Sequence, residues 1–81
     1  MINKPIAVLA QFSDDGRVNP LRFKIETEDG RESVQIGSSL LKVNNNIRME
    51  FICDITLNGV RHKCEIWFFK QDTRWILCNL K

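Results

Sequence analysis

Three Asp-Gly or Asn-Gly dipeptides divide much of this chain into short segments. Asp15-Gly16, Asp29-Gly30 and Asn58-Gly59 each lie between runs in which apolar and polar residues alternate. These dipeptides suit a two-residue type I′ turn, because both of its central positions require a positive φ. Alternation is the pattern of a strand with one buried face, and the helical period is nearly absent. The sequence therefore predicts an all-β fold of antiparallel hairpins.

The first two dipeptides select the same buried face of the strand between them. A turn centred on Asp15-Gly16 gives the pairs Ile6–Ile25, Ala7–Lys24, Val8–Phe23, Leu9–Arg22 and Ala10–Leu21, with Asp14 and Arg17 as an ion pair beside the turn. A turn centred on Asp29-Gly30 gives the pairs Phe23–Ile36 and Ile25–Val34. Pro20 lies in the shared strand and donates no hydrogen bond, so we expect a bulge near it, or the end of pairing to the third strand.

The third dipeptide predicts a longer hairpin. A turn centred on Asn58-Gly59 gives the inward pairs Met49–Phe68, Phe51–Ile66, Cys53–Cys64, Ile55–His62 and Leu57–Val60, and the outward pairs Arg48–Phe69, Glu50–Trp67 and Asp54–Lys63. A loop at Gln71-Asp72-Thr73 then returns the chain. We expect Ile76, Cys78 and Leu80 to join the inward row, and Trp75 and Leu77 to join Trp67 and Phe69 outside.

The pattern predicts two three-stranded meanders, from about Lys4 to Gly37 and from Arg48 to Leu80. The intervening segment from Ser38 to Asn46 is interpreted as a short irregular strand or a single turn. A lone three-stranded meander exposes its apolar face, so the two must pack together. We expect a single domain over residues 1–81 that forms a small six-stranded antiparallel barrel or roll.

Composition excludes several classes of protein. The 43% hydrophobic and 27% charged content is typical of a globular domain, and a net charge of +2 does not by itself indicate nucleic acid or a membrane surface. No run approaches the roughly 18 apolar residues of a membrane span. The three cysteines form no C-x-x-C pair, which favours reduced core thiols over a disulfide scaffold. We therefore expect a cytoplasmic chain from which no leader is removed.

An outer apolar row on the second meander raises the question of what covers it. The row comprises Ile52, Trp67, Phe69, Trp75 and Leu77, and leaving such large groups in water would be unfavourable. The cover could come from the chain itself, through residues 40–43 or the first strand. The other two candidates are a second copy, and a ligand or partner protein. For a protein partner or self-association, the contact residues would be Arg48, Trp67, Phe69, Trp75 and Leu77.

Catalytic and metal chemistry find little support in these residues. Cys53, His62, Cys64 and Cys78 are expected on the inward face, but their spacing lacks the tight knuckles of structural zinc sites. No carboxylate on that face would orient His62 for nucleophilic catalysis by Cys64. We expect a binding protein with no catalytic residue, no metal and no cofactor.

The alternative function is single-stranded nucleic-acid binding by a small barrel. Basic residues beside aromatic rings can hold a backbone while the rings stack on bases. The residues proposed for this role, together with the outer aromatics, are Arg61, Lys63 and Arg74. Acidic residues lie among them, as on an ordinary solvated sheet.

Four segments together resemble a family of small uncharacterised bacterial proteins, mostly from Gram-positive anaerobes. They are KPIAVLAQF, DGRVNPLRFKIE, NGVRHKCEIWF and RWIL, and they span nearly the whole chain. PLRF and the closing W-x-L are also similar to a domain of unknown function found beside bacterial DNA-repair polymerase-like proteins. These are strand patterns rather than catalytic signatures, so the resemblance implies the fold and assigns no site residue. We expect a protein-interaction module.

Overall fold

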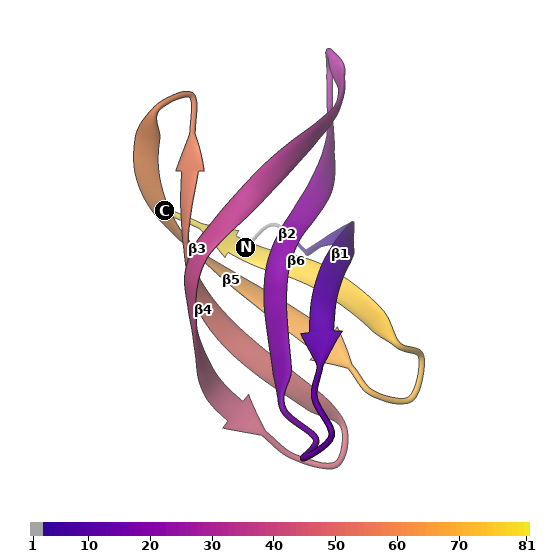
Figure 1. The fold of residues 1–81 in the computed structure, drawn as a ribbon. Coiled ribbons are helices and arrows are strands. Elements are labelled where there is room, and N and C mark those ends of the chain that lie inside the picture. Colours follow the sequence, from indigo (N-terminus) through magenta and orange to yellow (C-terminus); the bar gives the residue numbers. More distant parts are fainter. Residues whose placement is uncertain (1–2) are drawn as a thin grey trace.

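The protein is described by a computed structural model covering residues 3–81, and it is all-β over that range. The strands are β1 (Lys4–Phe12), β2 (Val18–Thr27), β3 (Gly30–Asn44), β4 (Arg48–Leu57), β5 (Val60–Phe69) and β6 (Arg74–Leu80). Each strand is antiparallel to its neighbours, and the order β1-β2-β3-β4-β5-β6 closes into a barrel (Figure 1). The predicted small six-stranded antiparallel barrel is confirmed.

The Asn58-Gly59 hairpin forms as predicted. Asn58 and Gly59 have φ angles of 51° and 77°, as both centres of a type I′ turn require. Every predicted pair between β4 and β5 is present, from Leu57–Val60 at the turn to Arg48–Phe69 at the far end. The alternation and the turn chemistry agree here, so the hairpin has a single register.

The Asp29-Gly30 hairpin has a different register from the predicted one. Thr27 pairs with Gly30 across Glu28 and Asp29, so Gly30 (φ 117°) opens β3 instead of occupying a central turn position. Phe23 therefore faces Val34, and the predicted pairs Phe23–Ile36 and Ile25–Val34 are wrong. The displacement is an even number of residues, so the buried face is unchanged. Phe23, Val34 and Ile36 all lie in the core.

The first hairpin follows the prediction only up to a bulge. The pairs Ala7–Lys24, Val8–Phe23 and Leu9–Arg22 are present, but Ala10 then pairs with Pro20 instead of Leu21. Ile6 pairs with Trp75 of β6 rather than with Ile25. The turn is a wider loop over residues 13–17, in which Arg17 Nε lies 2.8 Å from the carboxylate of Asp15, so the expected Asp14–Arg17 pair is wrong.

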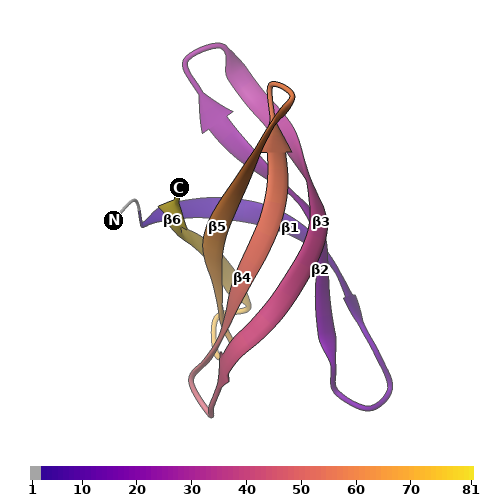
Figure 2. The same ribbon diagram turned by 90° about the vertical axis from the view of Figure 1, so that its left-hand side faces the viewer.

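Pro20 marks both irregularities that its missing N–H predicted. The β1–β2 ladder shifts register beside it, between Leu9 and Ala10. The β2–β3 ladder ends at the pair Arg22–Gln35, two residues from Pro20. Beyond this point β2 and β3 separate, as the view in Figure 2 shows.

β3 is a single strand of 15 residues, so the predicted boundary at Gly37 and the separate segment at residues 38–46 are wrong. Its first part pairs with β2 and its second part pairs with β4, starting at Ile36. The register shifts between Ile36 and Ser38 and again between Leu41 and Val43. One long strand therefore belongs to both predicted meanders and joins them into one sheet.

The predicted faces of β6 are reversed near its start. Phe69 pairs with Arg74, so Trp75 and Leu77 point into the barrel and are 7% and 1% exposed, while Ile76 pairs with Trp67 on the outside. A bulge between Glu65 and Ile66 then restores the predicted Cys64–Leu80 pair. A slip of one residue moves every side chain to the opposite face.

The core fills the barrel between β4, β5, β6 and the paired part of β2 and β3. Its buried members include Phe23, Val34, Ile36, Met49, Phe51, Cys53, Ile55, Cys64, Ile66, Phe68, Trp75 and Leu77. Val8, Ala10 and Val18 of the first hairpin pack against it and stay half-buried. The tip of the first hairpin, over residues 11–17, is exposed.

Candidate functional site

Two surfaces are candidates for function. One is the outer aromatic face, which keeps Arg48, Ile52, Trp67 and Phe69 of the predicted set and has Ile76 in place of Trp75 and Leu77. The other is a groove where β2 and β3 separate.

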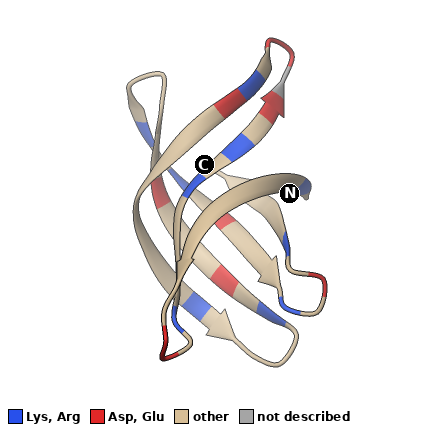
Figure 3. Cartoon of the chain, turned by 45° about the vertical axis from the view of Figure 1, so that its right-hand side comes forward, with Lys and Arg blue, Asp and Glu red and all other residues tan. Residues whose placement is uncertain are grey.

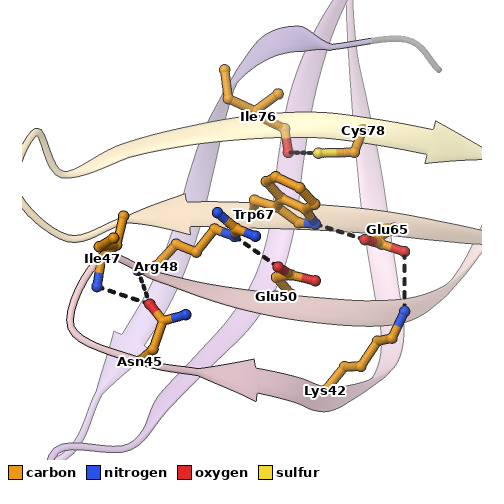
Figure 4. Close-up of polar contacts among 9 residues, drawn as sticks. All are labelled: Lys42, Asn45, Ile47, Arg48, Glu50, Glu65, Trp67, Ile76 and Cys78. Atoms are coloured by element: carbon orange, nitrogen blue, oxygen red, sulfur yellow. Dashed lines mark hydrogen bonds and ion pairs between the residues drawn. The ribbon is translucent and has the colours of Figure 1, made fainter.

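Trp67 is the centre of the outer aromatic face, and its polar and π contacts lie within the chain (Figure 4). The guanidinium carbon of Arg48 lies 4.3 Å from the ring centroid, in the range of a cation–π contact. The indole Nε1 donates a hydrogen bond of 2.6 Å to Glu65 Oε2. Phe69 makes an edge contact at 6.2 Å between centroids, and Arg74 lies 5.8 Å from the centroid of Phe69.

The charged side chains around Trp67 on this face are also paired with one another. Arg48 Nε donates to Glu50 Oε2 at 2.7 Å, and Glu50 is only 6% exposed. The backbone N–H of Arg48 is held by Asn45 Oδ1 at 2.9 Å, and Lys42 Nζ lies 3.9 Å from Glu65. The question of what covers the outer row therefore has a partial answer: Trp75 and Leu77 are inside the barrel, and charged side chains of the same face shield Trp67.

Cys78 lies on this face rather than on the predicted inward row. It is the extra residue of the β5–β6 bulge, and its thiol donates to the carbonyl of Ile76 at 3.9 Å. Burial raises the pKa of the Cys78 thiol to about 11, and the nearby carboxylates of Glu65 and Glu50 add to the effect. A thiol in this state is a neutral packing group, not a nucleophile.

The other cysteines are packed within the barrel. Cys53 faces Cys64 across β4 and β5, and both are buried and reduced. A hydrogen bond to Cys64, followed by burial, raises the pKa of Cys53. His62 Nδ1 lies 2.8 Å from the carbonyl oxygen of Lys81. Within residues 3–81, His, Cys, Asp and Glu side chains form no group of three arranged to hold a metal ion.

The structure does not bring together the basic residues of the nucleic-acid alternative. Arg61 and Lys63 lie near one end of β5, and Lys63 Nζ donates to Asp54 Oδ1 at 2.9 Å. Arg74 pairs with Phe69, six residues further along β5, which corresponds to about 20 Å. Arg74 also lies 3.7 Å from Asp72. Basic and acidic residues alternate over the strands instead of forming a basic stripe (Figure 3).

Asp54 links three strands and predicts a specific pH dependence. Ser38 Oγ of β3 donates to it at 2.7 Å and Lys63 of β5 at 2.9 Å, and these bonds lower the pKa of Asp54. Because the pKa of Asp54 is lower in the folded than in the unfolded state, its carboxylate stabilises the fold at pH values above the unfolded pKa. This contribution to stability is lost as the pH falls below about 4. We expect the urea midpoint to fall less for Asp54→Asn than for the wild type when the pH is lowered from about 5 to about 3. Parallel pH profiles for the two proteins would contradict this role for Asp54.

The groove has a volume of about 1100 Å³ and opens between the first hairpin and the second half of β3. Its lining is formed by Gln11, Phe12, residues 13–17 of the turn, Val18, Asn19, Ser39, Leu41, Asn44, Met49 and Phe51. It lies at the opposite end of β4 from the Asn58-Gly59 turn.

The floor of the groove is apolar and its rim is polar. Met49 and Phe51 are buried members of the core, whereas Phe12 is 60% and Leu41 is 43% exposed. The Phe12 ring contacts Phe68 edge-on at 5.9 Å, which fixes the side wall. A hydrogen bond of 3.4 Å from Ser39 Oγ to Asn19 Oδ1 joins the two walls. The site therefore offers apolar area below and hydrogen-bonding groups at the edge.

Both walls of the groove are unpaired strand edges. In residues 3–81, Val18, Asn19 and Pro20 have ladder partners only in β1, and residues 38–44 of β3 have theirs only in β4. A strand edge presents backbone N–H and C=O groups that another extended chain can pair. On the β2 side Pro20 removes one donor, so β3 is the better edge for pairing.

The sequence interpretation missed this groove, although Pro20 pointed to it. The proline predicts a bulge or the end of pairing to the third strand, but the sequence pattern also predicts that the third strand ends at about Gly37. The continuation of β3 past Gly37 is what gives the gap a second wall. Leu40 and Leu41, which could have covered the outer row, are both exposed, and Leu41 lines the groove.

The comparisons with known proteins found no match to this chain. No family model matches it, and no curated protein and no solved structure shows a match. The resemblance to small bacterial proteins therefore stays a prediction. In the described range, residues 3–81, there is also no helix with the length and apolar content needed to cross a membrane.

Proposed function

We propose that this chain is a protein-interaction module that binds an extended segment of a partner protein in the groove between β2 and β3. The observation that carries the proposal is the free edge of β3 over residues 38–44, which lines an open groove with an apolar floor. An extended segment would pair its backbone with this edge, as in other cases of strand addition. Its alternate side chains would point to the floor formed by Met49 and Phe51, beside the Phe12 side wall.

The outer aromatic face supports this function less well than the groove. Arg48 already covers the Trp67 ring, and Glu65 already accepts the indole N–H. A partner or a nucleic-acid base that stacked on Trp67 would have to displace these contacts. Groove residues Leu41 and Phe12, by contrast, are exposed without a covering side chain of this kind in the described part of the chain.

Peptide selection tests the proposal without knowledge of the partner. Random peptides displayed on phage would be selected on the folded domain, and a selected peptide would be titrated while backbone amide shifts are recorded by NMR. We expect the largest shifts at residues 38–44. Methylation of alternate peptide nitrogens should abolish binding, because strand addition depends on main-chain hydrogen bonds.

Two variants give this experiment a matched control. Leu41→Asp places a carboxylate on the groove wall and should weaken the selected peptide roughly tenfold or more, since burying a charge opposes binding. Val60→Asp makes the same change at a residue that is 57% exposed in the Asn58-Gly59 hairpin and should leave affinity unchanged. The proposal fails if no peptide is retained, if the shifts centre on Trp67 and Phe69, or if Leu41→Asp binds as well as the wild type.

A further inference from the structure

β1 has a free edge on the side that faces away from β2. Only Lys4, Pro5 and Ile6 pair with β6, opposite Leu77, Ile76 and Trp75. From residue 7 to Phe12, β1 has ladder partners only in β2 within residues 3–81. This edge lies on the β6 side of the first hairpin, whereas the groove lies on the β3 side, and Gln11 and Phe12 contribute to both.

The β1 edge from Val8 to Phe12 has no residue that discourages pairing, whereas the β2 edge has one. Natural edge strands are commonly protected by proline, lysine or a bulge. β2 has Pro20 at its free edge. The β1 segment from Val8 to Phe12 contains neither a charge nor a proline, and its Leu9 and Phe12 are 52% and 60% exposed.

We propose that a second copy of this chain occupies this edge, so that two barrels associate through antiparallel pairing of their β1 strands. A two-fold axis through Ala10 is the arrangement that keeps the second strand clear of β6, which occupies the edge up to Ile6. Val8 of one copy then faces Phe12 of the other, and Leu9 faces Gln11. The pairing satisfies the free backbone groups of both strands at once.

Charge complementarity supports a second copy as the occupant. Asp14 lies at the turn end of the edge, and Lys24 lies beside Ala7 at the other end. Neither makes an ion pair within residues 3–81. The two-fold axis places Ser13 of one copy opposite Ala7 of the other, which brings Asp14 near Lys24 of the second copy. The acidic and basic ends of the edge thus meet twice in one dimer.

Sedimentation equilibrium of the whole chain tests the dimer. We expect a concentration-dependent monomer–dimer equilibrium, and Leu9→Lys should raise its dissociation constant roughly tenfold or more, because a charge on an edge strand opposes pairing. Leu40→Lys makes the same change at a residue that is 68% exposed on β3 and should leave the equilibrium unchanged. A strict monomer at millimolar concentration, or equal effects of both variants, would overturn the proposal.

A charge exchange tests the orientation of the two copies. Asp14→Lys and Lys24→Asp should each weaken the dimer about two- to fivefold, as expected for exposed ion pairs, and the double variant should restore it. Additive weakening in the double variant would rule out this antiparallel arrangement. Because Leu9 does not line the groove, Leu9→Lys should still bind a groove-selected peptide, which separates the failure of the dimer from the failure of the groove.

Discussion

Replacing Trp75 with alanine is expected to lower the free energy of unfolding by about 3–5 kcal/mol, the usual cost of truncating a buried aromatic side chain. Trp75 is 7% exposed, and its ring centroid lies 4.8 Å from that of Phe68 and 5.9 Å from that of Phe51. An 81-residue domain has a total stability of roughly 4–12 kcal/mol. The variant should therefore be partly or wholly unfolded at room temperature, as circular dichroism and urea titration would show.

Trp67→Ala is the matched control, because it is the same change at the other tryptophan. Trp67 lies on the outer face and is half-buried, so its loss removes mainly the Arg48 contact and the hydrogen bond to Glu65. We expect a cost of about 1–2 kcal/mol. If the two variants cost comparable stability, or if Trp67→Ala costs more, Trp75 would not lie in the core. The two faces of β6 would then be reversed.

Replacing Arg48 with alanine should cost about 2–4 kcal/mol, because it leaves a carboxylate without its partner in a shielded position. Glu50 is 6% exposed and accepts from Arg48 Nε at 2.7 Å, and the same guanidinium covers Trp67. Arg74→Ala should cost less than about 1 kcal/mol, since the side chains of Arg74 and Asp72 are both 59% exposed.

A second substitution separates charge burial from packing at this position. In the Arg48→Ala background, Glu50→Gln removes the unpaired charge and should recover part of the lost stability in a urea titration. The remaining loss would represent the exposed face of Trp67. If Glu50→Gln lowers stability further in that background, the penalty does not arise from the unpaired carboxylate.

The local signals in the sequence were sufficient for the fold class and for the β4–β5 hairpin. Asn58-Gly59 can occupy both turn centres, and the alternation on either side agrees with that turn, so the register follows from residues close in the chain. The missing N–H of Pro20 likewise predicted a bulge or the end of the β2–β3 ladder near it, and the structure has both. These features depend on backbone chemistry that one or two residues determine.

The faces of β6 could not be read in the same way, because the preceding loop has no turn signature. The loop between Phe69 and Arg74 contains no glycine, and Thr73 adopts a φ of 49° that a β-branched residue rarely takes. The prediction assumed a three-residue loop, whereas four residues intervene. That single residue exchanged the positions of Trp75 and Ile76 and made a core residue look like a surface one.

The groove depends on a change of partner within one strand, which local pattern does not reveal. Ile36 and Ser38 pair with β4 while Gln35 pairs with β2. Nothing in the alternation of residues 30–44 distinguishes the two partners, because both lie in the same sheet. The functional proposal therefore required the three-dimensional register, although its cause at Pro20 is visible in the sequence.

Hydrogen exchange at backbone amides, followed residue by residue by NMR, tests the opening between β2 and β3 most directly. β4 pairs on both sides, so we expect protection at successive amides across its interior from Phe51 to Ile55. Between Ser38 and Leu41, only alternate amides pair with β4, and the others should exchange rapidly into the groove. Uniform protection of Ser38 to Leu41 at the level of β4 would mean that β2 or another strand covers this edge, and would contradict the account.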